Sequence, residues 1–144
     1  MSIAKILPSK PVASEHADAI LEIAYLMTAV DGRLGDDELE AYREVVAGVR
    51  GKASSADVDA LLSRFAGNVA HQEIAERVRA IGPTLPDDLR GLAFKIATAL
   101  SLVDLDSSRD EEELKDVLID ALGLDDERTD ALTQEVYMAF DADA

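Results

Sequence analysis

The 144-residue sequence predicts an all-α fold, a single bundle of about seven helices with two pseudo-symmetric halves. Three observations support this prediction. Apolar residues recur at spacings of three and four from Ala13 onward, which is the helical period. No stretch shows the sustained alternation with β-branched residues that is typical of strands. Hydrophobic residues are nearly half of the chain but few are aromatic, so Leu, Ile, Val and Ala must form the core.

Four helices are expected in the first half of the chain, bounded by residues that cap or end helices. Ser14 can cap the first, and Asp31-Gly32 ends it because glycine accepts the left-handed turn at a helix terminus. The second helix ends at Gly51, and Ser54 or Ser55 caps the third. The apolar stripes of the four helices run from Ala17 to Val30, Leu39 to Val49, Val58 to Phe65 and Ile74 to Ile81.

Three more helices are expected in the second half. Pro86-Asp87-Asp88 opens the fifth helix, since proline suits the first turn and acids complement the helix dipole. Gly123 ends the sixth helix, and the seventh begins at Asp125 or Asp126. The apolar stripes of these helices run from Leu89 to Val103, Leu114 to Leu122 and Leu132 to Phe140.

These seven helices predict one domain over residues 13–140, preceded by a flexible leader at 1–12 and followed by a frayed acidic tail at 141–144. The leader does not resemble a secretory signal, because Lys5 and Pro8 break its short apolar stretch. No apolar run approaches the length of a membrane span. With no cysteine in the chain, these features favour a cytoplasmic protein.

The charge of the chain is strongly negative, −16 overall, and concentrated towards its end. Residues 104–144 hold 15 acids but only three bases. Nucleic acids and anionic membranes are therefore poor partners, because phosphate contacts require Lys and Arg. Cations and a basic protein partner are favoured instead.

Two segments of the chain repeat one pattern, in which an apolar helix runs into an Asp and a Glu follows seven residues later. The first segment pairs Asp31 with Glu38, and the second pairs Asp104 with Glu111. If the two halves pack about a pseudo-twofold axis, these four carboxylates converge. Carboxylates held close repel unless a cation neutralises them, so the site would suit a divalent metal ion such as Ca²⁺, Mg²⁺ or Mn²⁺.

The paired A-x₆-D-x₆-E units, the Asp31-Gly32 dipeptide and the late Leu-Gly-Leu at 122–124 resemble the TerB-like family associated with tellurite resistance. The resemblance covers residues 17–140. It implies seven helices in two related halves, an acidic cluster proposed to bind metal, and a role in tellurite or other chemical stress response. It assigns the metal ligands to Asp31, Glu38, Asp104 and Glu111.

The second unit departs from the family pattern, because Leu105 replaces a Gly and Ser107 stands where an apolar residue is usual. Asp106 with Glu113 has the same seven-residue spacing and forms a competing register. Neither loop is an EF-hand, since Asp36 and Arg109 occupy the positions that require Gly.

Ordinary roles compete with the metal site. The four acids also suit helix capping, dipole complementation and turns. His16 and His71 have no histidine partner, and no nucleophile with a base or phosphate loop is evident, so we expect a non-enzymatic protein. The alternative function is a metal-independent acidic protein-interaction module. A metal-dependent hydrolase is a more distant option that would need an open coordination position.

Overall fold

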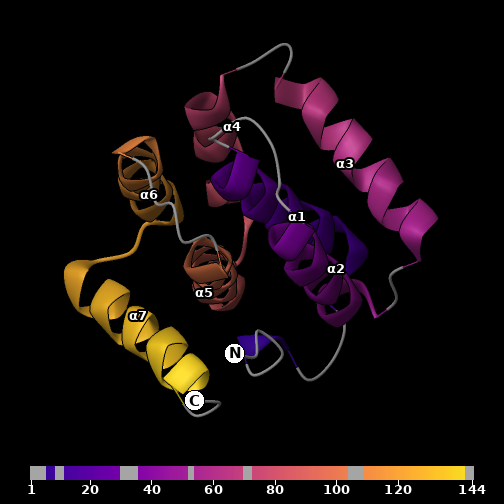
Figure 1. Cartoon of the computed structure of the whole chain (residues 1–144). Coiled ribbons are helices and arrows are strands. Elements are labelled where there is room, and N and C mark those ends of the chain that lie inside the picture. The colour runs from indigo at the N-terminus through magenta and orange to yellow at the C-terminus, as the bar shows by residue number, and fades with distance from the viewer. Residues whose placement is uncertain are drawn as a thin grey trace.

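The computed structural model describes residues 6–8, 12–29, 36–51, 54–69, 73–103 and 109–141. These ranges contain seven α-helices and no strand, which confirms the predicted all-α fold (Figure 1). The helices are α1 Ser14–Ala29, α2 Asp36–Arg50, α3 Ser55–Val69, α4 Ile74–Ile81, α5 Asp87–Val103, α6 Arg109–Leu122 and α7 Asp126–Asp141.

Several helix ends follow the local signals that the sequence carries, but the start of α1 does not. Ser14, its expected cap, is the first residue inside the helix, and the Ala13 carbonyl accepts from the Ala17 N–H at 2.8 Å. Ser54 Oγ accepts a hydrogen bond from the Asp57 N–H at 3.1 Å, so Ser54 caps α3. Asp125 Oδ1 accepts from the Arg128 N–H at 2.7 Å and caps α7 in the same way. Gly51 and Gly123, directly after α2 and α6, have φ values of 85° and 67°, a region that residues with a Cβ rarely adopt.

A short 3-10 helix, η2 (Gly82–Thr84), continues from α4 and was not expected from the sequence. Gly82 has right-handed helical angles, φ −50° and ψ −51°, so it does not break the helix as Gly51 and Gly123 do. It is instead needed for close packing. A Cβ at Gly82 would lie 2.8 Å from Ala121 Cβ and 2.9 Å from the Ala121 backbone, at the contact of η2 with α6.

The bundle is organised around α1 and α5. Helix α1 contacts α2, α3, α4, α5 and α6, while α5 contacts α1, α2, α6 and α7. Figure 1 shows α3 and α7 at opposite edges of the molecule, with α1 and α5 between them. Both central helices therefore bury side chains on more than one helical face.

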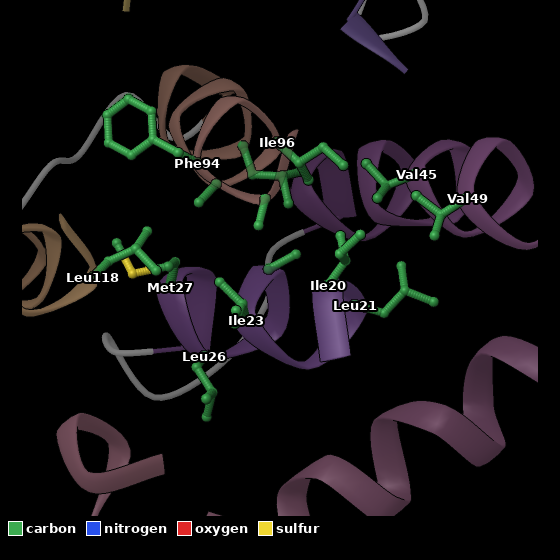
Figure 2. Packing of buried hydrophobic residues seen from close by; sticks show 14 of the residues in the cluster. Ile20, Leu21, Ile23, Leu26, Met27, Val45, Val49, Phe94, Ile96 and Leu118 are labelled. Carbon is green, nitrogen blue, oxygen red and sulfur yellow. The ribbon is translucent and has the colours of Figure 1, made fainter. Parts of the chain in front are cut away.

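The apolar stripes expected from the sequence form the core. Ile20, Ile23 and Ile96 fill the space between the packed helices in Figure 2. Leu21, Leu26 and Phe94 are also fully buried, although they are not among the residues expected to form the stripes of these two helices. Those residues are Ala17, Ile20, Ile23, Ala24, Met27 and Val30 in the first helix, and Leu89, Leu92, Ala93, Ile96, Leu100 and Val103 in the fifth. Leu21, Leu26 and Phe94 are buried because a helix with neighbours on several sides has no solvent-facing side left for most of its length.

The described part of the leader packs against the bundle. Ile6 is buried, and the Val12 N–H donates to the Val49 carbonyl at 2.8 Å. A Cβ at Gly48 would lie 2.7 Å from Leu7 Cδ1, so the absence of a side chain there makes room for Leu7. Among the described helices, none has the length and apolar character needed to cross a bilayer.

Candidate functional site

The structure describes only part of the predicted carboxylate site. Asp31 and Asp104 lie outside the described residues. Glu38 and Glu111 are each the third residue of a helix, α2 and α6 respectively, although their side chains also lie outside the described part. Both helices thus begin two residues before the Glu of the repeated pattern. In each unit, the Glu is therefore the third residue of the helix that follows the Asp in the chain.

The two hairpins of the repeat lie against each other in the core. Helix α1 packs on α5, α2 packs on α5, and α1 also contacts α6. Figure 2 shows Met27, near the end of α1, directed toward Leu118 of α6, while Phe94 of α5 lies above them in the view. Helices from distant parts of the chain are therefore direct neighbours, as a shared site between the hairpins would require.

The competing register is only partly described. Glu113 is exposed on α6, and Asp106 lies outside the described residues. Glu113 is five residues into its helix and therefore beyond the first turn, where Glu111 lies. An acid in the first turn of a helix ordinarily stabilises it by complementing the helix dipole. Glu38 and Glu111 are placed for this role, but the effect is weaker for Glu113.

A second group of charged residues, which the sequence analysis missed, lies where α1 meets α3 and α4. The Glu22 side chain is 8% exposed and is the buried end of an ion pair with Arg77. Arg77 Nε and Nη2 donate to Glu22 Oε2 and Oε1, each at 2.8 Å, and Asn68 Nδ2 donates to Oε2 at 3.3 Å. Every polar bond of this carboxylate shown here crosses between helices, so Glu22 joins α1 to α3 and α4.

The same face of α1 carries a second, more exposed ion pair, and two tyrosines lie near these charged residues. Asp18 Oδ2 lies 3.1 Å from Arg64 Nη2 of α3. Tyr42 of α2 is fully buried and donates its hydroxyl proton to the Leu21 carbonyl at 2.9 Å. Burial, together with the nearby Tyr25, Glu22 and Asp18, raises the pKa of Tyr42 far above its usual value of 10.0, while Arg64 opposes the change.

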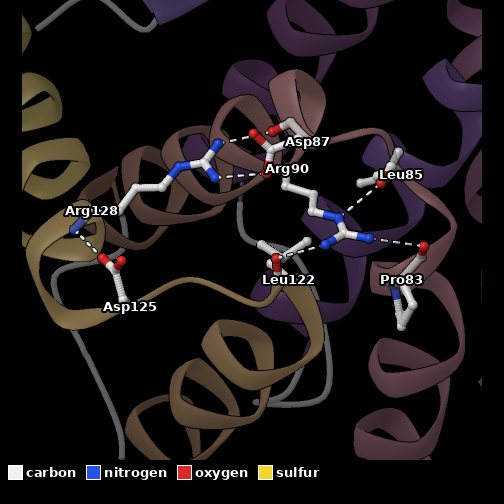
Figure 3. A network of polar contacts seen from close by, with 7 residues as sticks. All are labelled: Pro83, Leu85, Asp87, Arg90, Leu122, Asp125 and Arg128. Carbon is white, nitrogen blue, oxygen red and sulfur yellow. Dashed lines mark hydrogen bonds and ion pairs between the residues drawn. The ribbon is translucent and has the colours of Figure 1, made fainter.

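Two arginines join α5 to its neighbours (Figure 3). Arg90 Nε and Nη2 donate to the carbonyls of Leu85 and Pro83 at 2.8 and 3.1 Å, and Nη1 donates to Leu122 at the end of α6 at 3.4 Å. Arg128 of α7 donates to Asp87 Oδ1 and to the Asp87 carbonyl, both at 2.9 Å. Both arginines bind groups at helix ends, so their role is to hold elements together.

Within the described ranges, no three Asp, Glu or His side chains are grouped as a metal site would require. Burial raises the pKa of Tyr25 as well as that of Tyr42. His16 Nε2 lies 3.8 Å from its neighbour Glu15, and His71 lies outside the described residues.

The outer face of α7 carries both apolar and acidic side chains. Tyr137 is 48% exposed and Met138 is 69% exposed. Glu127 and Asp130 are exposed on the same helix. Of the larger contacts between the described helices, α7 takes part only in the one with α5.

Compared with known proteins, the chain matches no family model, no curated protein and no solved structure.

Proposed function

We propose that the protein is a non-enzymatic, divalent-cation-binding domain of TerB-like type, with Asp31, Glu38, Asp104 and Glu111 as its metal ligands. The observation that carries this proposal is the packing of the α1–α2 hairpin against the α5–α6 hairpin. Each hairpin contains one Asp–Glu unit, and each second helix begins two residues before its Glu. Neighbouring hairpins of one layout are the arrangement that a shared site needs.

The proposed mechanism is electrostatic. Four carboxylates brought together repel, and a hard cation such as Ca²⁺, Mg²⁺ or Mn²⁺ would neutralise them through all-oxygen coordination. Binding would join the loop after α1 to the loop after α5. Because a cation that binds only the folded chain stabilises it, the same event would strengthen the whole bundle and fix the surface that partners meet.

The resemblance supplies the proposed setting. A TerB-like domain would act in tellurite or other chemical stress response in the cytoplasm. The overall charge of −16 is consistent with attraction of cations, but a general negative field binds them weakly and without a defined number of sites. The test must therefore distinguish saturable binding at a defined site from weak attraction of cations to the overall negative charge.

Titration calorimetry of the full chain with Ca²⁺, Mg²⁺ and Mn²⁺ at physiological salt tests the proposal. We expect a saturable site for at least one ion, and a higher melting temperature in that ion. Asp31→Asn and Glu38→Gln should abolish saturation, and Asp104→Asn and Glu111→Gln should do the same if both hairpins contribute. Each variant removes one negative charge and nearly preserves side-chain size.

The matched controls are Asp106→Asn and Glu113→Gln, which make the same charge changes in the competing register. Glu40→Gln, on the exposed face of α2, measures the effect of the general field. If all of these variants weaken binding equally, or if no ion gives saturable heat or thermal stabilisation, the four-carboxylate site is wrong. If only the Asp106 and Glu113 variants lose binding, the ligand assignment in the second hairpin is wrong.

A further inference from the structure

The outer face of α7 has the composition of a docking surface. We define the inner face of α7 as the one that contacts α5. Leu132 on this face is half-buried, and Val136 is fully buried. At 100° per residue, Glu127, Asp130, Gln134, Tyr137 and Met138 fall on the opposite face. All five are exposed. We propose that this face of α7 binds a basic amphipathic helix of another protein.

The two apolar side chains would provide the centre of the contact. Tyr137 and Met138 are the large hydrophobic residues that remain exposed in the described chain, at 48% and 69%. Tyrosine is enriched where binding energy concentrates, because it buries a large rigid ring and keeps a polar hydroxyl. Methionine adapts its shape to apolar partners. A ridge of side chains at helical spacing fits the groove of a second helix.

The charge around these residues selects a basic partner. Glu127 and Asp130 are exposed on the same face, about 15 and 10 Å before Tyr137 along the helix axis, and Asp126 is exposed at the start of the helix. Two described bases in ion pairs that involve α7 are already engaged. Arg128 binds Asp87, and Lys95 Nζ of α5 lies 3.6 Å from Glu135 Oε2. A partner with Lys or Arg flanking its apolar stripe would therefore complement this face.

The same charge argues against other occupants. A second copy of this chain would carry another −16 and bring the same acids of α7 close together. Nucleic acids and anionic lipid surfaces would be repelled by these carboxylates. The proposal does not depend on the cation site, because none of the α7 residues that carry it belongs to the Asp–Glu units.

Fluorescence anisotropy with a labelled synthetic peptide tests the proposal. The peptide has about 18 residues, or five helical turns, with Leu along one face and Lys elsewhere. A second peptide of the same composition has its Leu residues scattered around the helix. We expect the full chain to bind the amphipathic peptide at physiological salt, in EDTA, at least about tenfold more tightly than the scattered one. EDTA removes divalent cations, so failure here is separate from failure of the cation site.

Variants locate the contact. Tyr137→Gln with Met138→Gln should weaken binding at least about tenfold, because the apolar centre is lost. Glu127→Gln with Asp130→Asn should weaken it less and reduce its salt dependence. Glu40→Gln with Glu44→Gln, exposed on α2, makes the same charge change elsewhere and should have little effect. All variants alter exposed side chains, and unchanged melting temperatures would show that the fold is kept.

Two results would overturn the proposal. In the first, both peptides bind equally and the Tyr137/Met138 variant behaves as the unchanged chain, which would show only attraction between opposite charges. In the second, sedimentation shows a dimer that the Tyr137/Met138 variant abolishes, which would make the occupant a second copy of this chain.

Discussion

Glu22 on α1 and Arg77 on α4 form a two-pronged ion pair, with both carboxylate oxygens accepting from the guanidinium at 2.8 Å. The two residues are 55 positions apart, and their side chains are 8% and 25% exposed. A buried carboxylate is costly unless it is paired and hydrogen-bonded. Glu22 therefore makes the position of α4 on α1 specific.

Removing one partner of this pair should be more damaging than removing both. We expect Arg77→Met to lower the free energy of unfolding by about 3 kcal/mol, because Glu22 is left without its counter-charge. The double variant Glu22→Leu/Arg77→Met should lose less than Arg77→Met alone. Urea unfolding of the single and double variants measures this, with Arg79→Met, exposed on the same helix, as the control. Additive losses would contradict the prediction.

Tyr42 should make stability fall at high pH. Its pKa is raised in the folded chain, so the stability linked to its protonated form is fully present below about pH 10 and is lost as the pH rises beyond that value. The unfolded chain releases this proton while the folded chain retains it. The expected slope is about 1.4 kcal/mol per pH unit above pH 10.

Tyr42→Phe separates this effect from other titrations. At neutral pH the variant should lose about 1 kcal/mol, since the hydrogen bond to the Leu21 carbonyl is gone. Above pH 10 it should lose stability less steeply than the unchanged chain. Urea unfolding at a series of pH values measures both, and parallel curves for the two proteins would show that Tyr42 does not cause the slope.

Replacing Gly67 and Gly82 with alanine should change the stability of the chain in opposite directions. Gly67 is exposed in α3 and a Cβ there would have no atom within 4 Å, so Gly67→Ala should stabilise the chain by about 0.5–1 kcal/mol through helix propensity. Gly82→Ala should destabilise it by about 1–3 kcal/mol, because its Cβ would meet the Ala121 backbone at 2.9 Å. Thermal unfolding compares them. A neutral Gly82→Ala would mean that η2 and α6 separate easily.

Arg90 should be more important than its position near a surface turn suggests. We expect Arg90→Met to cost on the order of 2 kcal/mol, because the carbonyls of Leu85, Pro83 and Leu122 lose a charged donor. Arg90→Lys should recover little, since one ammonium group cannot reproduce the fork geometry of a guanidinium. Urea unfolding measures both, and full recovery by lysine would show that charge alone is needed.

Helix boundaries were the feature best predicted from the sequence, because caps and breakers act locally. Gly51, Gly123 and the capping side chain of Ser54 all act as expected. The buried pair was missed, because its formation depends on which face of α1 receives α4. One signal was present. Glu22 is the only charge in the apolar run from Ala19 to Met27, where a helical residue must either reach solvent or find a partner.

The candidate metal site was predictable in its spacing but not in its geometry. The seven-residue interval places Glu38 and Glu111 at equivalent points of α2 and α6. Whether the side chains converge depends on loop conformations that short polar sequences do not determine, and Asp31 and Asp104 lie outside the described residues. The exposed pair Tyr137 and Met138 was also not foreseen, because only the packing of α7 on α5 shows which side of that helix faces solvent.

The central position of α1 has a consequence for folding. Because α1 touches helices from both halves of the chain, a fragment that ends after α4 would leave α1 without α5 and α6 and expose Ile20, Ile23 and Met27 to water. Neither half is then an autonomous folding unit. The two halves that carry the repeated pattern should therefore fold together, and the whole chain should unfold in one cooperative transition.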